Sequence, residues 1–460
     1  MKNRKIFINI VMGLFISGVL YAQNNPFGNP LIPDMIADAS IQEIDGTFYC
    51  YATTDGYGRG LETSGPPVVW KSKDFVHWSF EGTYFPSAAT EKFWAPSKLV
   101  QANGKYYIYP TINGYMYPAV AEHPEGPFKL ARGKDEFYLP YTSSTLLRGK
   151  NPEGIDAEIF IDDDGQAYVF WNKKHVAKLA DDMLTVDSVV QVIETPQKVY
   201  SEGPIFFKRK GVYYYLYTIG GDEKYQYAYG MSRVSPMGPF EFPEQNIIST
   251  TNYEKGIFGP GHGCVFNLEG TEDYYFAYLE FGRRSTNRQT YVNKLEFNKD
   301  GTIRPVELSM DGVGALRKIK QEKKLSIDTV YTSSVASPLK IEPMKDKLCQ
   351  RTEYFIPSFI SDGANGSRWL ANPQDKEKWV VADLGKVCRI RKSEVYFVRP
   401  TAGHSYILEG SVDGNTWEKC GGNVDLKPRS PQTDSVNNKY RYLRIKIQKG
   451  VAGIWEWNIY

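Results

Sequence analysis

The chain has 460 residues, of which 42% are hydrophobic and 23% charged, and this composition excludes a disordered chain and is typical of two domains. The formal net charge is +2, from 55 basic and 53 acidic residues, and no long basic run occurs, so nucleic acids are not expected as partners. Aromatic residues make up 14% of the chain, which favours β-structure and provides flat apolar faces for ring-shaped ligands such as sugars.

Residues 1–22 have the pattern of a secretory signal peptide. Lys2, Arg4 and Lys5 precede an apolar stretch that ends at Leu20, and Ala22 is a small residue at the expected cleavage site. No cysteine directly follows the apolar stretch, and no later stretch is long enough to span a bilayer. We therefore expect an exported protein, periplasmic or extracellular, without a membrane span.

The chain contains five cysteines, an odd number, and none of them forms a CxxC pair. Zinc sites and redox motifs are therefore poorly supported. Free buried thiols are expected for Cys50 and Cys264. The sequence leaves open whether two of Cys349, Cys388 and Cys420 form a disulfide.

A hairpin turn followed by a tyrosine-rich alternating strand recurs five times between residues 23 and 316. The turn glycines are Gly46, Gly104, Gly165, Gly211 and Gly270. Asp-Gly and Asn-Gly pairs between apolar runs are typical of hairpins, because Gly and Asn tolerate a positive φ. Five similar units of about four strands each predict an all-β fold, a five-bladed β-propeller over residues 23–316.

A conspicuous side chain stands eight to ten residues before each of these glycines. The five residues are Asp38, Trp94, Asp156, Glu202 and His262. This position lies at the start of the predicted innermost strand of each blade, and equal offsets place the five side chains at the same end of the central channel. The sequence therefore predicts that residues far apart in the chain share one pocket.

The three carboxylates in this set also have structural interpretations. Asp38 could be a turn residue bonded to backbone amides, and Glu202 could belong to a structural ion pair, since a Glu beside an apolar strand is rarely buried unless paired. Asp156 could be an edge residue. Glu158 is its rival, because a residue two positions along a strand points to the same face.

The other conspicuous residues have alternatives of the same kind. Trp94 could pack in the core, and His262 could be a core histidine with satisfied hydrogen bonds. Asp162, Asp163 and Asp164 lack the alternation of a calcium-binding EF-hand loop and lead directly into a hairpin, so a solvated turn is favoured there.

Two carboxylates that flank a sugar bond are the minimum for glycoside hydrolysis. One donates a proton to the leaving oxygen, and the other activates water or attacks directly. A third carboxylate nearby raises the pKa of the acid by like-charge repulsion and keeps it protonated. The sequence contains no nucleophile elbow, no H-E-x-x-H and no phosphate-binding glycine loop, so serine, metal and nucleotide chemistry are less well supported.

Several of these segments resemble the family 43 glycoside hydrolases, which are five-bladed propellers acting with inversion on arabinose- and xylose-containing polysaccharides. The matching segments, which fall within residues 27–315, are Ala37–Ile41, Phe93–Pro96, Ile155–Phe160, and Ser201–Pro204 with Lys208–Tyr214. Ala39 and Ala157 depart from the family, which commonly has proline after the base and after the modulator. That departure weakens a subfamily assignment more than the mechanism.

The resemblance implies a role for each residue. Asp38 would be the general base, Glu202 the general acid, and Asp156 the residue that tunes and orients Glu202. Trp94, His262 and Arg288 would contact substrate, although Arg288 could equally be a solvent-facing strand residue.

The resemblance also implies an activity on oligo- or polysaccharides. We expect an exo-acting inverting enzyme for α-L-arabinofuranosyl or β-D-xylosyl groups, with base and acid carboxyls about 6.5 to 9.5 Å apart. The chemistry would need no cofactor, and some members hold a calcium ion in the channel, near the position of His262. The alternatives are a catalytically silent sugar-binding propeller, a retaining enzyme or transglycosylase, and action on another sugar such as β-galactan. Candidate rim loops are residues 54–60 and 132–150.

The pattern changes beyond residue 316. Residues 317–345 are expected to form a polar linker, and residues 346–460 a smaller β-sandwich of short alternating strands. Phrases such as Trp379–Gly385 and Tyr406–Trp417 resemble the discoidin-like (F5/8 type C) domain, which includes carbohydrate-binding modules. Its tryptophans are interpreted as packing residues, and no binding residue is assigned.

Overall fold

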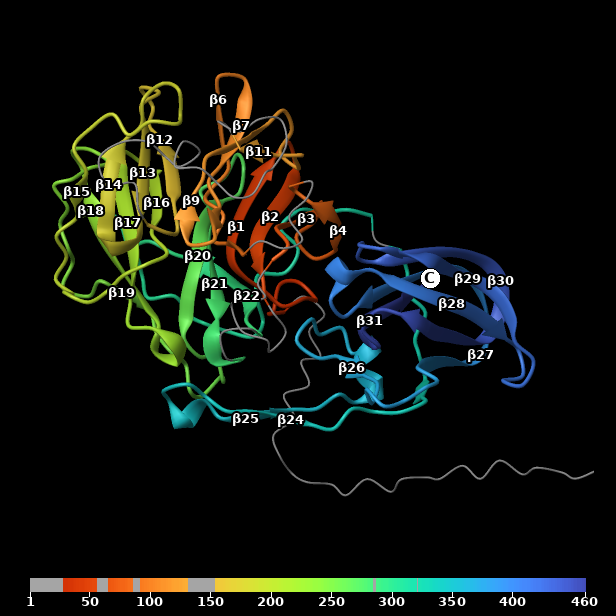
Figure 1. Ribbon diagram of the computed structural model, residues 1–460. Coiled ribbons are helices and arrows are strands. Elements are labelled where there is room, and N and C mark those ends of the chain that lie inside the picture. The colour runs from red at the N-terminus through yellow and green to blue at the C-terminus, as the bar shows by residue number, and fades with distance from the viewer. Residues whose placement is uncertain (1–27, 56–64, 86–91, 131–153, 284–286, 321) are drawn as a thin grey trace, which may run out of the picture.

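The computed structural model describes residues 28–55, 65–85, 92–130, 154–283, 287–320 and 322–460 (Figure 1). The predicted signal peptide, the predicted rim loop 132–150 and all but the first two residues of the rim loop 54–60 lie outside these ranges. Within them, no helix is long and apolar enough to cross a membrane.

The first part of the chain forms five consecutive antiparallel sheets, which are the blades of a propeller. Blade 1 consists of β1 (Ile36–Ile44), β2 (Thr47–Thr54), β3 (Val68–Ser72) and β4 (Trp78–Thr83). Blade 2 consists of β6 (Val100–Ala102), β7 (Lys105–Ile108), β10 (Ala119–Ala121) and β11 (Lys129–Leu130), and a small sheet beside it of β5 (Phe93–Trp94), β8 (Thr111–Ile112) and β9 (Tyr115–Met116).

The other three blades follow in chain order. Blade 3 consists of β12 (Glu158–Ile161), β13 (Ala167–Trp171), β14 (His175–Lys178) and β15 (Gln191–Val192), with η3 (Asn172–Lys174) after β13. Blade 4 consists of β16 (Ile205–Arg209), β17 (Val212–Ile219), β18 (Gln226–Ser232) and β19 (Ile247–Ser249), with η4 (Asp222–Lys224) before β18. Blade 5 consists of β20 (Pro260–Asn267), β21 (Tyr274–Glu280) and β22 (Gln289–Leu295), with η5 (Phe281–Arg283) after β21.

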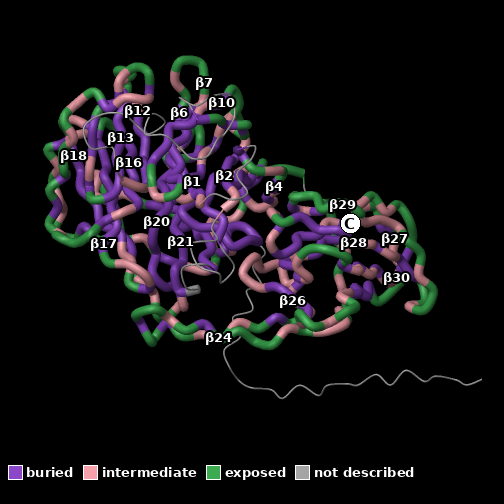
Figure 2. Tube along the Cα trace, viewed as in Figure 1, coloured by how far each residue is buried: buried purple, intermediate pink, exposed green. Residues whose placement is uncertain are grey.

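The predicted glycines join the first two strands of every blade. All five have a positive φ, between 66° and 86°, which a tight hairpin requires. The blades then pack by strand alternation. In β17, which is buried throughout, Tyr214 and Leu216 face blade 5, whereas Tyr213, Tyr215 and Tyr217 face blade 3. The tyrosine-rich run of β17 therefore packs against the sheets on both sides, and Figure 2 shows the strands of the propeller as largely buried.

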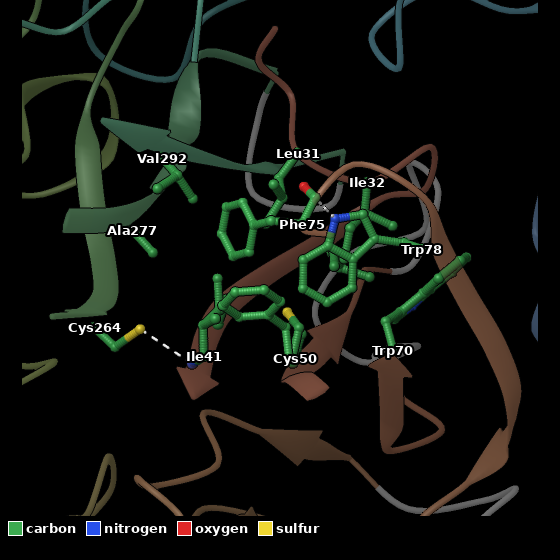
Figure 3. Close-up of a cluster of buried hydrophobic side chains, with 14 of the residues drawn as sticks. Leu31, Ile32, Ile41, Cys50, Trp70, Phe75, Trp78, Cys264, Ala277 and Val292 are labelled. Carbon is green, nitrogen blue, oxygen red and sulfur yellow. Dashed lines mark hydrogen bonds between the residues drawn. The ribbon is translucent and has the colours of Figure 1, made fainter. Parts of the chain in front are cut away.

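Blade 5 closes the ring by packing against blade 1. Figure 3 shows Ile41, Cys50 and Trp70 of blade 1 in one apolar cluster with Cys264, Ala277 and Val292 of blade 5. The backbone N–H of Ile41 donates to Cys264 Sγ at 3.1 Å. The buried free thiols expected for Cys50 and Cys264 are confirmed, and the other three cysteines are also free.

The C-terminal domain is a β-sandwich in which two long strands, β27 (Trp379–Phe397) and β30 (Gln432–Lys449), run through both halves of one continuous sheet. The sheet order is β26-β31-β27-β30-β28-β29, from β26 (Trp369–Leu370), β28 (His404–Ser411), β29 (Glu418–Lys427) and β31 (Gly453–Ile459). Two short helices lie between strands, η7 (Pro357–Ser361) and η8 (Pro400–Ala402). The predicted all-β class, a propeller followed by a sandwich, is confirmed.

Part of the predicted linker 317–345 belongs to this domain. Strand β23 (Thr329–Thr332) pairs with β27, and Leu325, Ile327 and Val330 pack against the core of the sandwich. Strand β24 (Leu339–Ile341) pairs with β25 (Arg351–Glu353), and η6 (Lys347–Cys349) lies at the tip of this hairpin. The prediction of a linker was wrong for these residues, because their apolar side chains are short patches within a polar sequence.

Candidate active site

Four of the five residues singled out by their spacing gather at one end of the channel. His262 Nδ1 lies 3.6 Å from Asp156 Oδ2 and 3.9 Å from Asp38 Oδ1. The backbone N–H of Gly203, next to Glu202, donates to Asp156 Oδ2 at 3.1 Å. Blades 1, 3, 4 and 5 each supply one of these side chains, as the spacing predicted.

The backbone is irregular where these side chains enter the channel. The pairing of β1 with β2 shifts register between Ala37 and Ser40, and that of β20 with β21 shifts between Gly261 and Gly263, so Asp38 and His262 lie in bulges. Asp38 has a φ of 51° and Asp156 one of 61°. Such bulges and left-handed residues redirect side chains and are common at active sites.

Asp38 is held by an arginine. Arg288 donates from both of its terminal nitrogens to the two oxygens of Asp38, at 3.2 and 3.3 Å. The same arginine donates to the buried Asp55 from its backbone nitrogen at 2.7 Å and from Nη2 at 2.9 Å. Burial lowers the pKa of Arg288, but Asp38 and Asp55 outweigh burial and raise it above its usual range. The guanidinium is therefore a permanent charge that fixes the Asp38 carboxylate.

Glu202 is in a different electrostatic environment from Asp38. Burial and the neighbouring charge of Asp156 raise the pKa of Glu202 to about 7. Burial, and then the charge of Asp38, raise the pKa of Asp156 to about 7 as well. The hydroxyl of Tyr225 donates to Glu202 Oε1 and opposes the shift. A carboxylic acid with a pKa near the working pH is suited to donate a proton in catalysis.

Trp94 does not lie at the start of an innermost strand, although the spacing predicts this position. It lies on β5, in the small sheet, whereas the innermost strand of blade 2 begins only at Val100. Ala95, with a φ of 40°, interrupts the strand between them. Trp94 is half-buried and pairs with Thr111, whose hydroxyl accepts the backbone N–H of Asp156 at 3.0 Å. Trp94 is thus near the site, and its role as a sugar platform stays a prediction.

The rival carboxylates are used elsewhere. Glu158 accepts the backbone N–H of Lys98 at 3.0 Å, and burial raises its pKa to about 7. Asp162 and Asp163 accept from Lys208 at 2.7 and 2.8 Å, and Gly165 completes the hairpin turn by donating to the Asp162 carbonyl. The expected turn is confirmed at 162–165, with the addition that it is tied to blade 4 by an ion pair.

Two residues of the site were not predicted from the sequence. Asp55 follows Gly46 by nine residues, as Asp38 precedes it by eight, so the spacing read forwards across the hairpin would have found it. Tyr225 lies between η4 and β18, where no repeat marks it.

The described residues contain no group of three or more His, Cys, Asp or Glu side chains arranged to hold a metal ion. A calcium ion near His262 would therefore lack a cage of side-chain ligands from this part of the chain.

Comparison with known proteins identifies both domains. The model of glycosyl hydrolases family 43 matches residues 27–303, and the F5/8 type C domain model matches residues 344–459. A solved structure described as a glycoside hydrolase is 78% identical, with a TM-score of 0.92, over 95% of this chain and 100% of that one.

Among curated proteins, the beta-D-galactofuranosidase xynD of Aspergillus niger is 29% identical over 63% of this chain and 88% of its own length. The arabinoxylan arabinofuranohydrolase of Paenibacillus polymyxa is 26% identical over 66% of this chain and 55% of its own length. The family model covers more than half of the sequence, and the chain therefore belongs to family 43 of the glycosyl hydrolases.

Proposed function

We propose that the protein is an exported, inverting, exo-acting glycosidase that removes α-L-arabinofuranosyl or β-D-xylosyl groups from plant-type polysaccharides. The observation that carries the proposal is the contrast between two carboxylates of one site. Asp38 is fixed by Arg288, whereas burial and the charge of Asp156 raise the pKa of Glu202 to about 7, and Glu202 accepts a hydrogen bond from the Tyr225 hydroxyl. A carboxyl that can donate a proton near neutral pH, beside a second carboxylate whose orientation is fixed, is what glycoside hydrolysis needs.

The proposed reaction is a single displacement. Asp38 accepts a proton from a water molecule as the water oxygen bonds to the anomeric carbon. Glu202 donates its proton to the glycosidic oxygen as the bond from that oxygen to the anomeric carbon breaks. When Asp156 is ionised, its charge raises the pKa of Glu202, and its acceptance of the Gly203 N–H fixes the backbone beside Glu202.

The sugar is proposed from the relatives. The Paenibacillus polymyxa protein supports arabinofuranosyl groups, and a Vibrio relative named xylan 1,3-beta-xylosidase supports xylosyl groups. A second candidate is the β-D-galactofuranosyl group, which the Aspergillus niger relative favours. The ring carbons of β-D-galactofuranose and α-L-arabinofuranose have the same configuration, so the two sugars differ mainly in the exocyclic chain.

The test is a panel of aryl α-L-arabinofuranosides, β-D-xylosides, β-D-galactofuranosides and β-D-galactosides, with wild type and Glu202→Gln. We expect turnover of one pentoside by the wild type and a loss of at least about 10²-fold in the variant. Equal inactivity of both proteins on every substrate would support a silent sugar-binding propeller instead. Proton NMR of the first anomer released distinguishes inversion from retention.

A further inference from the structure

The β24–β25 hairpin of the C-terminal domain, residues 339–353, lies against the propeller. In Figure 1 this hairpin extends away from the sandwich to the ends of blades 4 and 5. Its tip contacts blade 4 and the segment that leads into blade 5: Lys345 pairs with Asp222, and the Tyr253 hydroxyl donates to Asp346. We call residues 339–353 the strap.

The first important contact is made by Glu223, in η4. Glu223 is completely buried. Its two carboxylate oxygens accept the backbone N–H groups of Met344 at 2.6 Å and Lys345 at 3.0 Å. A buried carboxylate without such donors is strongly unfavourable. Without the strap, η4 would have to move to bring Glu223 to water.

The second contact is made by Glu280, at the end of β21. This fully buried residue accepts from Arg351 Nη2 at 2.8 Å and from the backbone N–H of Phe258 at 3.2 Å. Arg351 is therefore a cation from the strap that compensates a charge inside blade 5. Removal of one partner of such a buried pair leaves the other charge uncompensated.

Both contacts lie beside residues of the active site. Glu223 is two residues from Tyr225, which donates to Glu202. Glu280 of β21 pairs with Gln289 of β22, the neighbour of Arg288. Phe281, next to Glu280, packs edge-on against the Tyr225 ring at 5.6 Å. Gln289 is itself held by the C-terminal domain, because its amide donates to the carbonyl of Asn365 at 3.0 Å.

We propose that the strap is a positioning element of the active site, which holds Tyr225 on Glu202 and Arg288 on Asp38 through Glu223 and the Arg351–Glu280 pair. The C-terminal domain then contributes to catalysis without touching the substrate. The assignment of Glu202 as acid and Asp38 as base comes from the proposed function.

The test uses the full-length protein and needs no substrate. The carboxyl carbon of Glu202 is titrated by carbon-13 NMR in glutamate-labelled protein and assigned by its absence in Glu202→Gln. The titratable groups around Glu202 include Asp156, Tyr225, His262 and Asp38, together with Tyr200 and Tyr227. Tyr225→Phe removes a donor that favours the carboxylate, so it raises the pKa of Glu202. We expect Glu223→Gln to raise it by roughly half a unit or more, and the double variant to match Tyr225→Phe alone.

Kinetics on whichever glycoside is cleaved give a second readout. Arg351→Met should lower kcat about tenfold and leave KM within about threefold, and Arg351→Lys should restore most of the rate. The matched control is Lys340→Met, which breaks an exposed strap pair with Glu342 and should leave kcat unchanged.

The proposal would be overturned if the pKa of Glu202 in both Glu223→Gln and Arg351→Met equalled that of the wild type. It would also be overturned if the effects of Glu223→Gln and Tyr225→Phe on this pKa were additive. If Glu223→Gln does not fold, the two Arg351 variants decide the question. A wild type that cleaves no glycoside would refute the proposed function, whereas the titration would still decide whether the strap positions Tyr225.

Discussion

Replacement of Asp156 by Asn is expected to stabilise the protein at alkaline pH while it reduces activity. Asp156 is 5% exposed, and burial and the charge of Asp38 raise its pKa from 3.8 to about 7. Asn retains an oxygen that can accept the Gly203 N–H, but it cannot ionise. The change therefore removes the charge and keeps the hydrogen bond.

The size of the effect follows from proton linkage. Because the pKa of Asp156 is higher in the folded state than in the unfolded state, the folded state binds more protons between about pH 4 and pH 7. The free energy of unfolding consequently falls as pH rises through that window. The full effect is about 4 kcal/mol, of which about 2.5 kcal/mol arises between pH 5 and pH 8. The melting temperature of the variant, relative to wild type, should then be roughly 5 °C higher at pH 8 than at pH 5.

The assay is thermal denaturation of wild type and Asp156→Asn at the two pH values, with a pH–rate profile of each. The charge of Asp156 raises the pKa of Glu202, so its loss should move the alkaline limb of the rate profile to lower pH. An equal melting difference at pH 5 and pH 8 would refute the reasoning, because Asp156 would then carry no charge-dependent cost.

Three further outcomes are expected. Gly203→Ala places a Cβ 2.7 Å from the His262 ring at a φ of 52°, so kcat/KM should fall at least about tenfold. The control is Gly211→Ala, which has a φ of 77° and open space around it and should leave kcat/KM unchanged. Asp55→Asn weakens the buried ion pair with Arg288, so the free energy of unfolding, measured by urea denaturation, should fall by about 3 kcal/mol, and kcat should also fall. Unchanged values would show that Asp38 alone fixes the arginine. EDTA should alter neither kcat nor the melting temperature, and recovery of lost activity by added calcium would contradict this expectation.

The sequence was sufficient for the repeating architecture because the turn chemistry is local. Each blade begins with a hairpin whose glycine requires a positive φ, and the distance back from that glycine located Asp38, Asp156, Glu202 and His262. The same spacing failed to describe the setting of Trp94, because Ala95 and Pro96 interrupt the inner strand of blade 2. A proline inside an expected inner strand was a visible sign of that interruption.

Contacts between distant segments were beyond the sequence pattern. Tyr225 reaches Glu202 only because η4 turns the chain between β17 and β18, and the strap reaches Glu223 from more than one hundred residues away. The polar composition of residues 317–345 concealed β23, although Thr329–Thr332 contains the β-branched and aromatic residues that strands favour.

The geometry of the carboxylates depends on the closed ring more than on any single blade. Asp38, Asp156 and Gly203 all have a left-handed backbone at the mouth of the channel, a conformation that costs a non-glycine residue about 1 to 2 kcal/mol. Hydrogen bonds between neighbouring blades offset this cost, since Asp156 donates to Thr111 of the sheet beside blade 2 and accepts from Gly203 ahead of blade 4. Asp156 is therefore held from both sides, and Asp38 is held by Arg288 from beside blade 5, so the acid and the base are placed by the packing of the whole propeller.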